Sequence, residues 1–156
     1  MTGWDRHLTA GDRQVVHAVL LGYADRLDAD DVDGILDCLT PDVHLEFFSG
    51  RVVIDGLDRA RQMFEETVRS KHNADPAITT MHQLPNVLVE PAAPGRANVR
   101  TTGTVYAYSG PGHPLDVRGL AYRQECVLAG DRWLIARLEH ESLWQFSVEQ
   151  AGLHQR

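Results

Sequence analysis

From about residue 78 onward the sequence is a succession of long strand-like segments separated by short turns, and this pattern constrains the fold more than any other feature. The segments span residues 78–90, 97–108, 117–128 and 132–143. Each is rich in Val, Thr, Tyr or Leu, and Gly or Pro occurs in every turn between them. Consecutive strands with such short connections pair antiparallel, so we expect an antiparallel sheet.

The first of these segments carries one histidine on a mostly apolar face. A regular strand would point the following side chains the same way: Ile78, Thr80, His82, Leu84 and Leu88. An imidazole among such neighbours needs a hydrogen-bond partner. Pro85 cannot donate to a strand ladder, so we predict a bulge or an edge position there.

The first half of the sequence has helical periodicity. Residues 9–12, Thr-Ala-Gly-Asp, have the form of a capping box that begins a helix reaching about Asp28. Its apolar residues recur at steps of three and four and form one stripe: Val16, Val19, Leu20, Tyr23, Ala24 and Leu27. Asp28 lies at the inner edge of that stripe, which makes it a candidate partner for His82.

Shorter elements follow this helix. We predict a second helix capped by Asp30 or Asp31 and ended at residues 40–42, strands at 43–48 and 51–54, a third helix beginning near Leu57, and a loop at 70–76. Helices followed by antiparallel strands predict an α+β fold. We expect a cone-shaped, strongly curved, mostly antiparallel sheet with the N-terminal helices on its concave face. A single domain should span residues 1–156, with short flexible tails at about 1–8 and 150–156.

The composition narrows the classes of partner. A net charge of −7 argues against nucleic acid, because a protein that binds phosphates needs a basic face. No apolar run is long enough for a membrane helix, and the N-terminus lacks the apolar block of a signal peptide. We therefore expect a cytoplasmic protein. Some strands are apolar on both faces, which predicts a homodimer through the sheet.

The metal-binding residue types show no ligand pattern. Cys38 and Cys126 lack the spacing of a metal knuckle and are predicted to be buried free thiols. The histidines show no ligand spacing with acids or cysteines. We infer neither a metal site nor a cofactor.

Several segments together resemble the SnoaL-like branch of the superfamily that contains nuclear transport factor 2 and scytalone dehydratase. The segments are residues 23–33, 39–43, 79–82 and 131–135. The resemblance extends over roughly residues 15–146 and implies a cystatin-like α+β barrel. Members of this superfamily include dehydratases, polyketide cyclases, ketosteroid isomerases and proteins without catalysis, so the resemblance specifies the fold more closely than the activity.

The resemblance also implies site residues. The helix aspartate of the dehydratases corresponds to Asp28, and their first-strand histidine corresponds to His82. Phe47 takes the position of a tyrosine, and Thr101 takes the position of a second histidine. A polar residue of the third long strand falls near Tyr122. Two hydrogen-bond donors of the dehydratases are thus replaced.

Asp28 and His82 suit acid–base chemistry. An imidazole can take a proton from a carbon next to a carbonyl, or give one to a leaving hydroxyl, at neutral pH. A carboxylate on the other ring nitrogen fixes the tautomer and stabilises the imidazolium. The alternative is a buried polar contact between helix and sheet without turnover.

Five further residues are candidates for binding a hydrophobic small-molecule substrate: Tyr23, Phe47, Thr101, Tyr122 and Trp144. The hydroxyl groups of Tyr23, Thr101 and Tyr122 would position the substrate. Tyr23 is equally a core aromatic with its hydroxyl at the rim, and Phe47 and Trp144 are equally core or lid residues.

Three functional hypotheses remain open from the sequence. The first is a small cofactor-independent lyase, isomerase or cyclase that acts on a hydrophobic carbonyl compound of secondary or steroid-type metabolism through Asp28 and His82. The second is a non-catalytic ligand-binding or assembly protein on the same fold. The third is an epoxide-opening hydrolase or cyclase with Asp28 as the base. An enzyme should have an apolar pocket that the pair faces.

Overall fold

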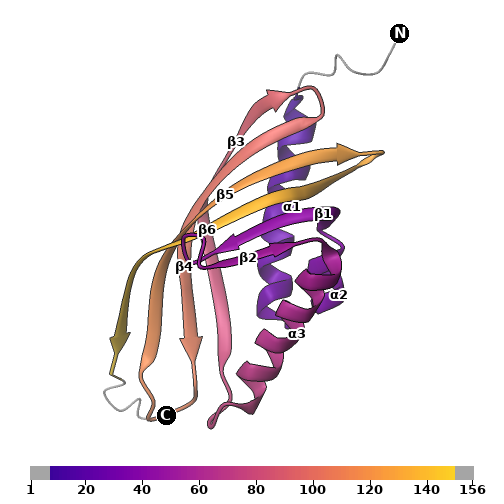
Figure 1. Ribbon diagram of the computed structural model, residues 1–156. Coiled ribbons are helices and arrows are strands. Elements are labelled where there is room, and N and C mark those ends of the chain that lie inside the picture. The colour runs from indigo at the N-terminus through magenta and orange to yellow at the C-terminus, as the bar shows by residue number, and fades with distance from the viewer. Residues whose placement is uncertain (1–7, 150–156) are drawn as a thin grey trace.

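The computed structural model describes residues 8–149, which form three helices and one six-stranded sheet (Figure 1). The helices are α1 (Ala10–Asp28), α2 (Val32–Leu36) and α3 (Leu57–Asn73). The strands are β1 (Leu39–Phe47), β2 (Val52–Asp55), β3 (Thr79–Ala93), β4 (Arg96–Tyr108), β5 (Leu115–Ala129) and β6 (Arg132–Val148). Apart from Leu8, the predicted tails lie outside the described residues.

The sheet has the strand order β2-β1-β6-β5-β4-β3. Every neighbouring pair is antiparallel except β1 with β6, which is parallel. Figure 1 shows the strongly twisted strands with α1 behind them and α3 beside their lower part. The predicted α+β fold and its mostly antiparallel sheet are therefore confirmed. None of the described helices is both long and apolar enough to cross a membrane.

Element boundaries differ from the prediction in three places. β1 begins at Leu39, ahead of Pro41, because the carbonyl of Cys38 accepts a hydrogen bond from the backbone N–H of Ile135 in β6. The register of β1 with β6 shifts between Leu39 and His44, around the proline. α3 continues through the polar residues 70–73, which carry no apolar signal of their own. β6 runs on to Val148 because it continues to pair with β5 as far as Leu115.

Pro85 causes a bulge in β3, as predicted. The register with β4 shifts between Gln83 and Asn86. Before the shift, Thr80, His82 and Leu84 lie on the inner face, and after it Val87 and Val89 take that face. The predicted inward position of Leu88 is wrong, since one inserted residue reverses the alternation and leaves Leu88 49% exposed.

The helix α1 lies along the open edge of β3. The Arg13 side chain donates to the carbonyl of Val89 near one end of α1. Asp28, the last residue of the helix, accepts a hydrogen bond from the backbone N–H of His82 at 2.6 Å. An edge strand otherwise presents unpaired backbone groups to solvent, and α1 satisfies these two.

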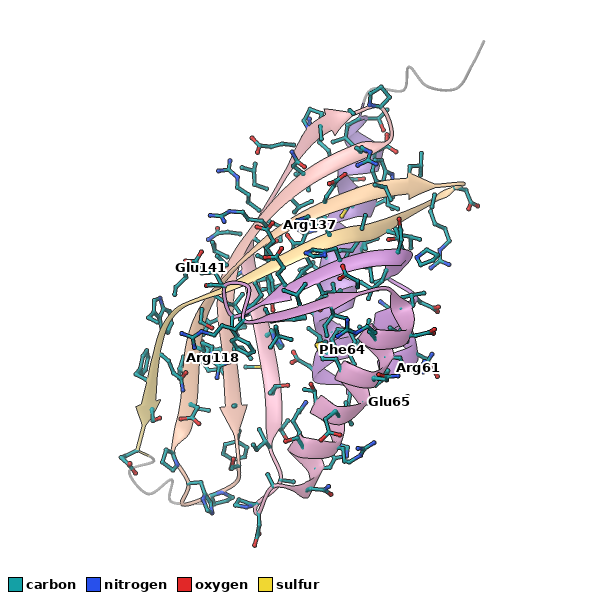
Figure 2. All side chains as sticks on the ribbon, viewed as in Figure 1. Arg61, Phe64, Glu65, Arg118, Arg137 and Glu141 are labelled. Carbon is teal, nitrogen blue, oxygen red and sulfur yellow. The ribbon has the colours of Figure 1, made fainter. Side chains whose placement is uncertain are left out.

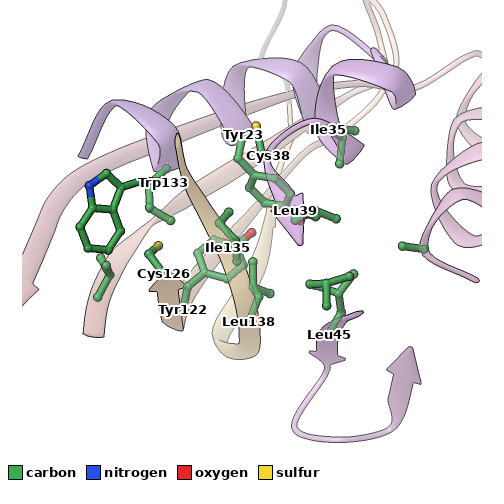
Figure 3. Packing of buried hydrophobic residues seen from close by; sticks show 14 of the residues in the cluster. Tyr23, Ile35, Cys38, Leu39, Leu45, Tyr122, Cys126, Trp133, Ile135 and Leu138 are labelled. Carbon is green, nitrogen blue, oxygen red and sulfur yellow. The ribbon is translucent and has the colours of Figure 1, made fainter. Parts of the chain in front are cut away.

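The core lies between the helices and the inner face of the sheet (Figure 3). The stripe of α1 is buried as predicted at Val16, Leu20 and Tyr23. Figure 3 shows Trp133 at one end of the side chains drawn and Leu45 well separated from it. Burying each large apolar side chain contributes about 1.5–3 kcal/mol, so this layer anchors α1 against β5 and β6.

The predicted capping box at the start of α1 is present and is tied to the sheet. Thr9 and Asp12 exchange side-chain and backbone hydrogen bonds. Asp12 is buried, and its second oxygen accepts from the indole nitrogen of Trp133 at 3.2 Å. One carboxylate therefore caps the helix and satisfies a buried donor of β6.

Replacing this carboxylate should destabilise the protein. We expect Asp12→Ala to lower the free energy of unfolding by about 2–4 kcal/mol, since it removes a cap and leaves a buried indole N–H unpaired. Asp58, exposed in the first turn of α3, supplies the matched control, and Asp58→Ala should cost at most about 1 kcal/mol. Urea unfolding measures both variants. Equal losses would contradict the double role of Asp12.

Candidate functional site

A cavity of about 390 Å³ lies between the inner face of the sheet and helices α1 and α3. Its walls are largely apolar and include Leu27, Ile35, Phe47, Met63, Phe64 and Leu120. Polar side chains interrupt them: Tyr23, Asp30, Thr67, Lys71, Thr80, His82, Arg118, Tyr122 and His140. In Figure 2 Arg118 projects from the sheet and Phe64 from α3. An apolar cavity with a few converging polar groups is the usual form of a small-molecule site.

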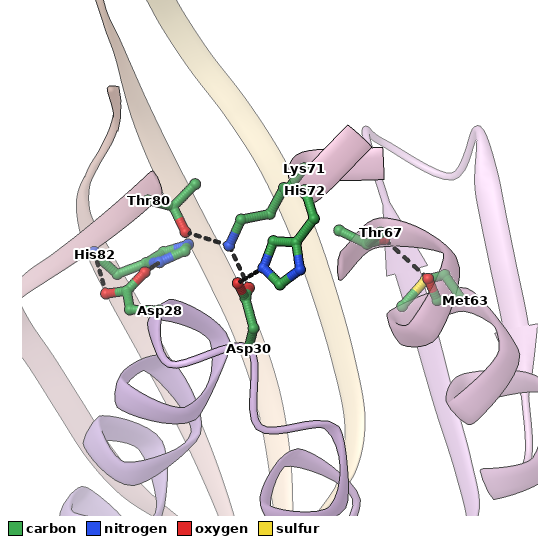
Figure 4. Close-up of polar contacts among 8 residues, drawn as sticks. All are labelled: Asp28, Asp30, Met63, Thr67, Lys71, His72, Thr80 and His82. Carbon is green, nitrogen blue, oxygen red and sulfur yellow. Dashed lines mark hydrogen bonds and ion pairs between the residues drawn. The ribbon is translucent and has the colours of Figure 1, made fainter. Parts of the chain in front are cut away.

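Asp28 and His82 form a closely bonded pair at the wall of this cavity (Figure 4). His82 Nδ1 lies 2.6 Å from Asp28 Oδ1, and the backbone N–H of His82 donates to Asp28 Oδ2. A carboxylate only accepts hydrogen bonds, so in the neutral ring Nδ1 carries the proton and Nε2 is unprotonated. The side chain of His82 is 12% exposed and that of Asp28 21%.

The position of the pair follows from local structure. The α1 stripe is buried against the sheet, which brings the end of the helix to the edge of β3. His82 is directly opposite Val105 of β4, and its own amide points to the open edge, where Asp28 accepts it. Both carboxylate oxygens are thus engaged by one residue. Asp28 lies behind His82, whereas His82 lines the cavity.

A second polar cluster lies beside the pair (Figure 4). Lys71 donates to the carboxylate of Asp30 and, at 3.1 Å, lies within hydrogen-bond distance of Thr80 Oγ1, while His72 Nε2 is 2.9 Å from the other oxygen of Asp30. Burial alone would raise the pKa of Asp30, but the hydrogen bonds from Lys71 and His72 hold it below its ordinary value. The charge of Lys71 is therefore neutralised at the cavity wall.

His140 of β6 lies on the cavity wall among aromatic rings. The ring centroids of Phe48 and Tyr122 are each 5.3 Å away, and the backbone N–H of Phe48 points at His140 Nδ1 at 3.4 Å. Burial, with the nearby Arg118 and His82, lowers the pKa of His140 to about 4. The ring is therefore neutral at pH 7, accepts at Nδ1 and carries its proton on Nε2.

Two tyrosine hydroxyls lie at the same end of the cavity. Tyr23 is buried, and its hydroxyl makes no hydrogen bond within residues 8–149. Burial, with smaller effects of Tyr122 and Cys38, raises the pKa of Tyr23 well above its ordinary value. Burial, and then the charge of Asp28, raises the pKa of Tyr122 as well. Both hydroxyls are therefore protonated donors at neutral pH.

The structure brings some of the predicted binding residues to the cavity and leaves others out. Tyr23, Phe47 and Tyr122 line it. Thr101 does not, because it is buried deeper in the core, where its hydroxyl lies 3.3 Å from Gln124 Oε1. Trp144 lies outside as well. Its ring covers Gly119 on the outer face of the sheet and stacks on Phe146 with centroids 5.5 Å apart.

Sequence reasoning missed several polar residues of the cavity, among them Lys71, Arg118 and His140. Two bulges in β6 shift the alternation, so the inward positions of that strand do not follow one parity and His140 was missed. In β5 the alternation is regular, so Leu120 and Arg118 face the same way as Tyr122. The predicted position of Tyr122 could therefore have identified Arg118 as a cavity residue. Among the described residues no group of three or more His, Cys, Asp or Glu side chains is arranged to hold a metal ion.

Comparison with known proteins identifies the family. The model of the SnoaL-like domain family matches residues 9–139, so the chain belongs to this family. A search of curated protein sequences gave no significant match.

Solved structures share the fold at low sequence identity. A candidate scytalone dehydratase from Novosphingobium aromaticivorans is 14% identical, with a TM-score of 0.74 over 93% of this chain and 96% of its own. A hexachlorocyclohexane dehydrochlorinase, LinA type 2, is 13% identical, with a TM-score of 0.76 over 94% and 93%. ActVI-ORFA from Streptomyces coelicolor is 13% identical, with a TM-score of 0.73 over 86% and 98%.

The buried, neutral His140 should make stability depend on pH. Its pKa of about 4 in the folded protein is below the ordinary value of about 6.5, so the unfolded chain binds a proton first as the pH falls. Stability is therefore lost between about pH 6.5 and 4. We expect His140→Gln to reduce the loss between pH 7 and pH 5 by up to about 2 kcal/mol.

Urea unfolding at the two pH values measures this effect. The control is His17→Gln, because His17 is exposed on α1. This variant should leave the pH dependence of the free energy of unfolding unchanged. A pH dependence in His140→Gln equal to that of the wild type would contradict a neutral His140.

Proposed function

We propose that this protein is a small lyase, isomerase or cyclase that acts without a cofactor on a hydrophobic compound bearing a carbonyl group. One observation carries the proposal: His82 lines an apolar cavity with its Nδ1 proton held by Asp28, which leaves Nε2 as a base. A cavity of about 390 Å³ suits a compound of one or two rings.

The proposed reaction begins with transfer of a proton from carbon to His82 Nε2. The electron pair of the C–H bond moves toward the adjacent carbonyl, whose oxygen becomes an enolate. Asp28 stabilises the imidazolium that forms. In a lyase the enolate then returns to the carbonyl, a carbon–carbon double bond forms, and the C–O bond to a hydroxyl on the next carbon breaks while the imidazolium protonates that oxygen, so that water leaves. In an isomerase the imidazolium returns the proton to another carbon as the carbonyl is restored. Apolar walls such as Phe64 and Leu120 exclude water and strengthen these polar contacts.

Two features of the site favour this assignment of roles. Both oxygens of Asp28 are bonded to His82, so Asp28 is less available as the base of an epoxide-opening reaction. The hydroxyl of Tyr23, without a partner in the described part of the chain, offers a donor for a substrate oxygen. Structural relatives that are named as a dehydratase and a dehydrochlorinase support an elimination, in which a base also removes a proton from carbon.

Proton abstraction can be tested before the substrate is identified. A panel of hydrophobic ketones and aldehydes is incubated with the protein in deuterated water, and exchange next to the carbonyl is followed by mass spectrometry. For any compound that the wild type exchanges, we expect His82→Gln to slow exchange by roughly 10²–10⁴-fold, since it removes the base. Asp28→Asn should also slow it strongly.

The matched control is His17→Gln, an exposed histidine of the same helix that carries Asp28. It should leave exchange unchanged. Exchange at the wild-type rate in both His82→Gln and Asp28→Asn would overturn the proposal. Tight ligand binding without exchange in the wild type would support the non-catalytic alternative.

We also propose that two copies of the chain associate through the outer face of the sheet, in the cytoplasm. Cross-strand pairing aligns Met81, Tyr106, Val117 and Phe146 in one row across β3 to β6 on this face. Met81, Phe146 and the adjacent Trp144 are each about half exposed. An apolar row of this kind is complementary to a second copy of itself, because it requires no charge matching.

Sedimentation equilibrium tests this association. We expect a dimer for the wild type and a monomer for Phe146→Glu, since a buried unpaired carboxylate is costly. Val15→Glu is the matched control, because Val15 is equally exposed on α1, away from this face. A wild-type monomer, or a Phe146→Glu variant that remains dimeric, would exclude this interface.

A further inference from the structure

The charges that line the cavity are not evenly matched. Two cations reach its wall, Lys71 and Arg118. Lys71 is paired with Asp30. Arg118 forms no ion pair with a carboxylate among residues 8–149, and its Nε is buried without a hydrogen-bond partner there. A buried guanidinium N–H without an acceptor is unusual in a folded protein and indicates a position where an acceptor is missing.

Arg118 lies on the same face of the sheet as His82. Strand pairing sets His82 opposite Val105, and Val105 opposite Arg118. The three residues form one row across β3, β4 and β5, and all three line the cavity. Neighbouring strands are about 4.8 Å apart, so the backbones of His82 and Arg118 are separated by about 10 Å. A ligand of ring size can contact both side chains at once.

The neighbours of Arg118 leave its charge available. The carboxylate of Asp28 is engaged at both oxygens by His82. His140, whose pKa the charge of Arg118 helps to lower, is neutral and presents an N–H rather than an acceptor. The hydroxyl of Tyr122 is likewise protonated. His140 and Tyr122 therefore offer donors beside Arg118, and the carboxylate of Asp28 is already engaged. An anionic oxygen of a ligand would supply the missing acceptor.

We propose that Arg118 is a ligand-binding residue and that the cavity takes a ligand whose anionic oxygen lies against its guanidinium, across the cavity from His82. The oxygen belongs either to a carboxylate of the ligand or to the enolate formed during the reaction. The carboxylate alternative is independent of catalysis. The enolate alternative rests on the proposed function, because it requires His82 to remove the neighbouring proton.

Two matched pairs of aromatic probes test the proposal by titration calorimetry. The first compares 4-nitrobenzoate with its neutral analogue 4-nitrobenzamide. The second compares 4-nitrophenolate with nitrobenzene, at a pH where the phenol is ionised. We expect the wild type to bind at least one anion tenfold or more tightly than its neutral analogue. Binding of the benzoate favours a carboxylate ligand, and binding of the phenolate alone favours an enolate.

Arg118→Met should remove this preference for the anion, and Arg118→Lys should keep part of it. The matched control is Arg123→Met, which removes the same charge from the exposed outer face of the same strand. It should keep the full preference. Thermal melting of each variant shows that it is folded.

His82→Gln separates this inference from the proposed function. The preference for the anion should persist in this variant even if no compound undergoes proton exchange in the wild type. A wild type that prefers neither anion would overturn the inference. A preference that survives in Arg118→Met would overturn it as well.

Discussion

The hydrogen bonds between Asp28 and His82 join the end of α1 to the open edge of β3, and the site depends on them. One oxygen of the carboxylate accepts from the imidazole and the other from the backbone amide of the same residue. The edge of the sheet is closed by the same group that orients the ring. The helix cannot shift along the strand without breaking both bonds, so the fold itself fixes the tautomer of His82.

The remainder of the cavity is a largely apolar space with a few hydrogen-bond donors at its wall. Tyr23, Tyr122 and His140 are all buried and all uncharged at neutral pH, because burial opposes their ionisation. Lys71 is neutralised by Asp30. Among residues 8–149, the hydroxyl of Tyr23 and the Nε of Arg118 are buried at the cavity wall without a hydrogen-bond partner, and His82 directs its Nε2 toward the cavity as the proposed base. With the proposed base His82 at one side and the proposed anion-binding Arg118 at the other, the ligand would place its acidic C–H bond near His82 and its anionic oxygen near Arg118.

Much of the architecture could be predicted from the sequence, because it rests on local signals. The capping box at Thr9, the stripe of α1 and the bulge at Pro85 are encoded by neighbouring residues. The proximity of Asp28 and His82 came from family resemblance and from the need of a histidine on an apolar face for a partner. The cavity residues of β5 and β6 depend instead on long-range register. Two bulges of β6, opposite Leu120 and Cys126 of β5, decide which side chains of β6 face inward. For that reason His140 was not predicted as a cavity residue, and Trp144, a predicted binding residue, lies outside the cavity on the outer face of the sheet. Arg118 follows the regular alternation of β5 and was overlooked.

The central claim is that Asp28 holds His82 as a base directed into the cavity. Long-range ¹H–¹⁵N correlation spectra of the histidine rings at neutral pH test it most directly, with His82→Gln to assign the signal. The structure predicts that neutral His82 carries its proton on Nδ1 and that Nε2 has the shift of an unprotonated nitrogen. In Asp28→Asn this tautomer should lose its preference. A neutral His82 that is protonated on Nε2 in the wild type would contradict the claim.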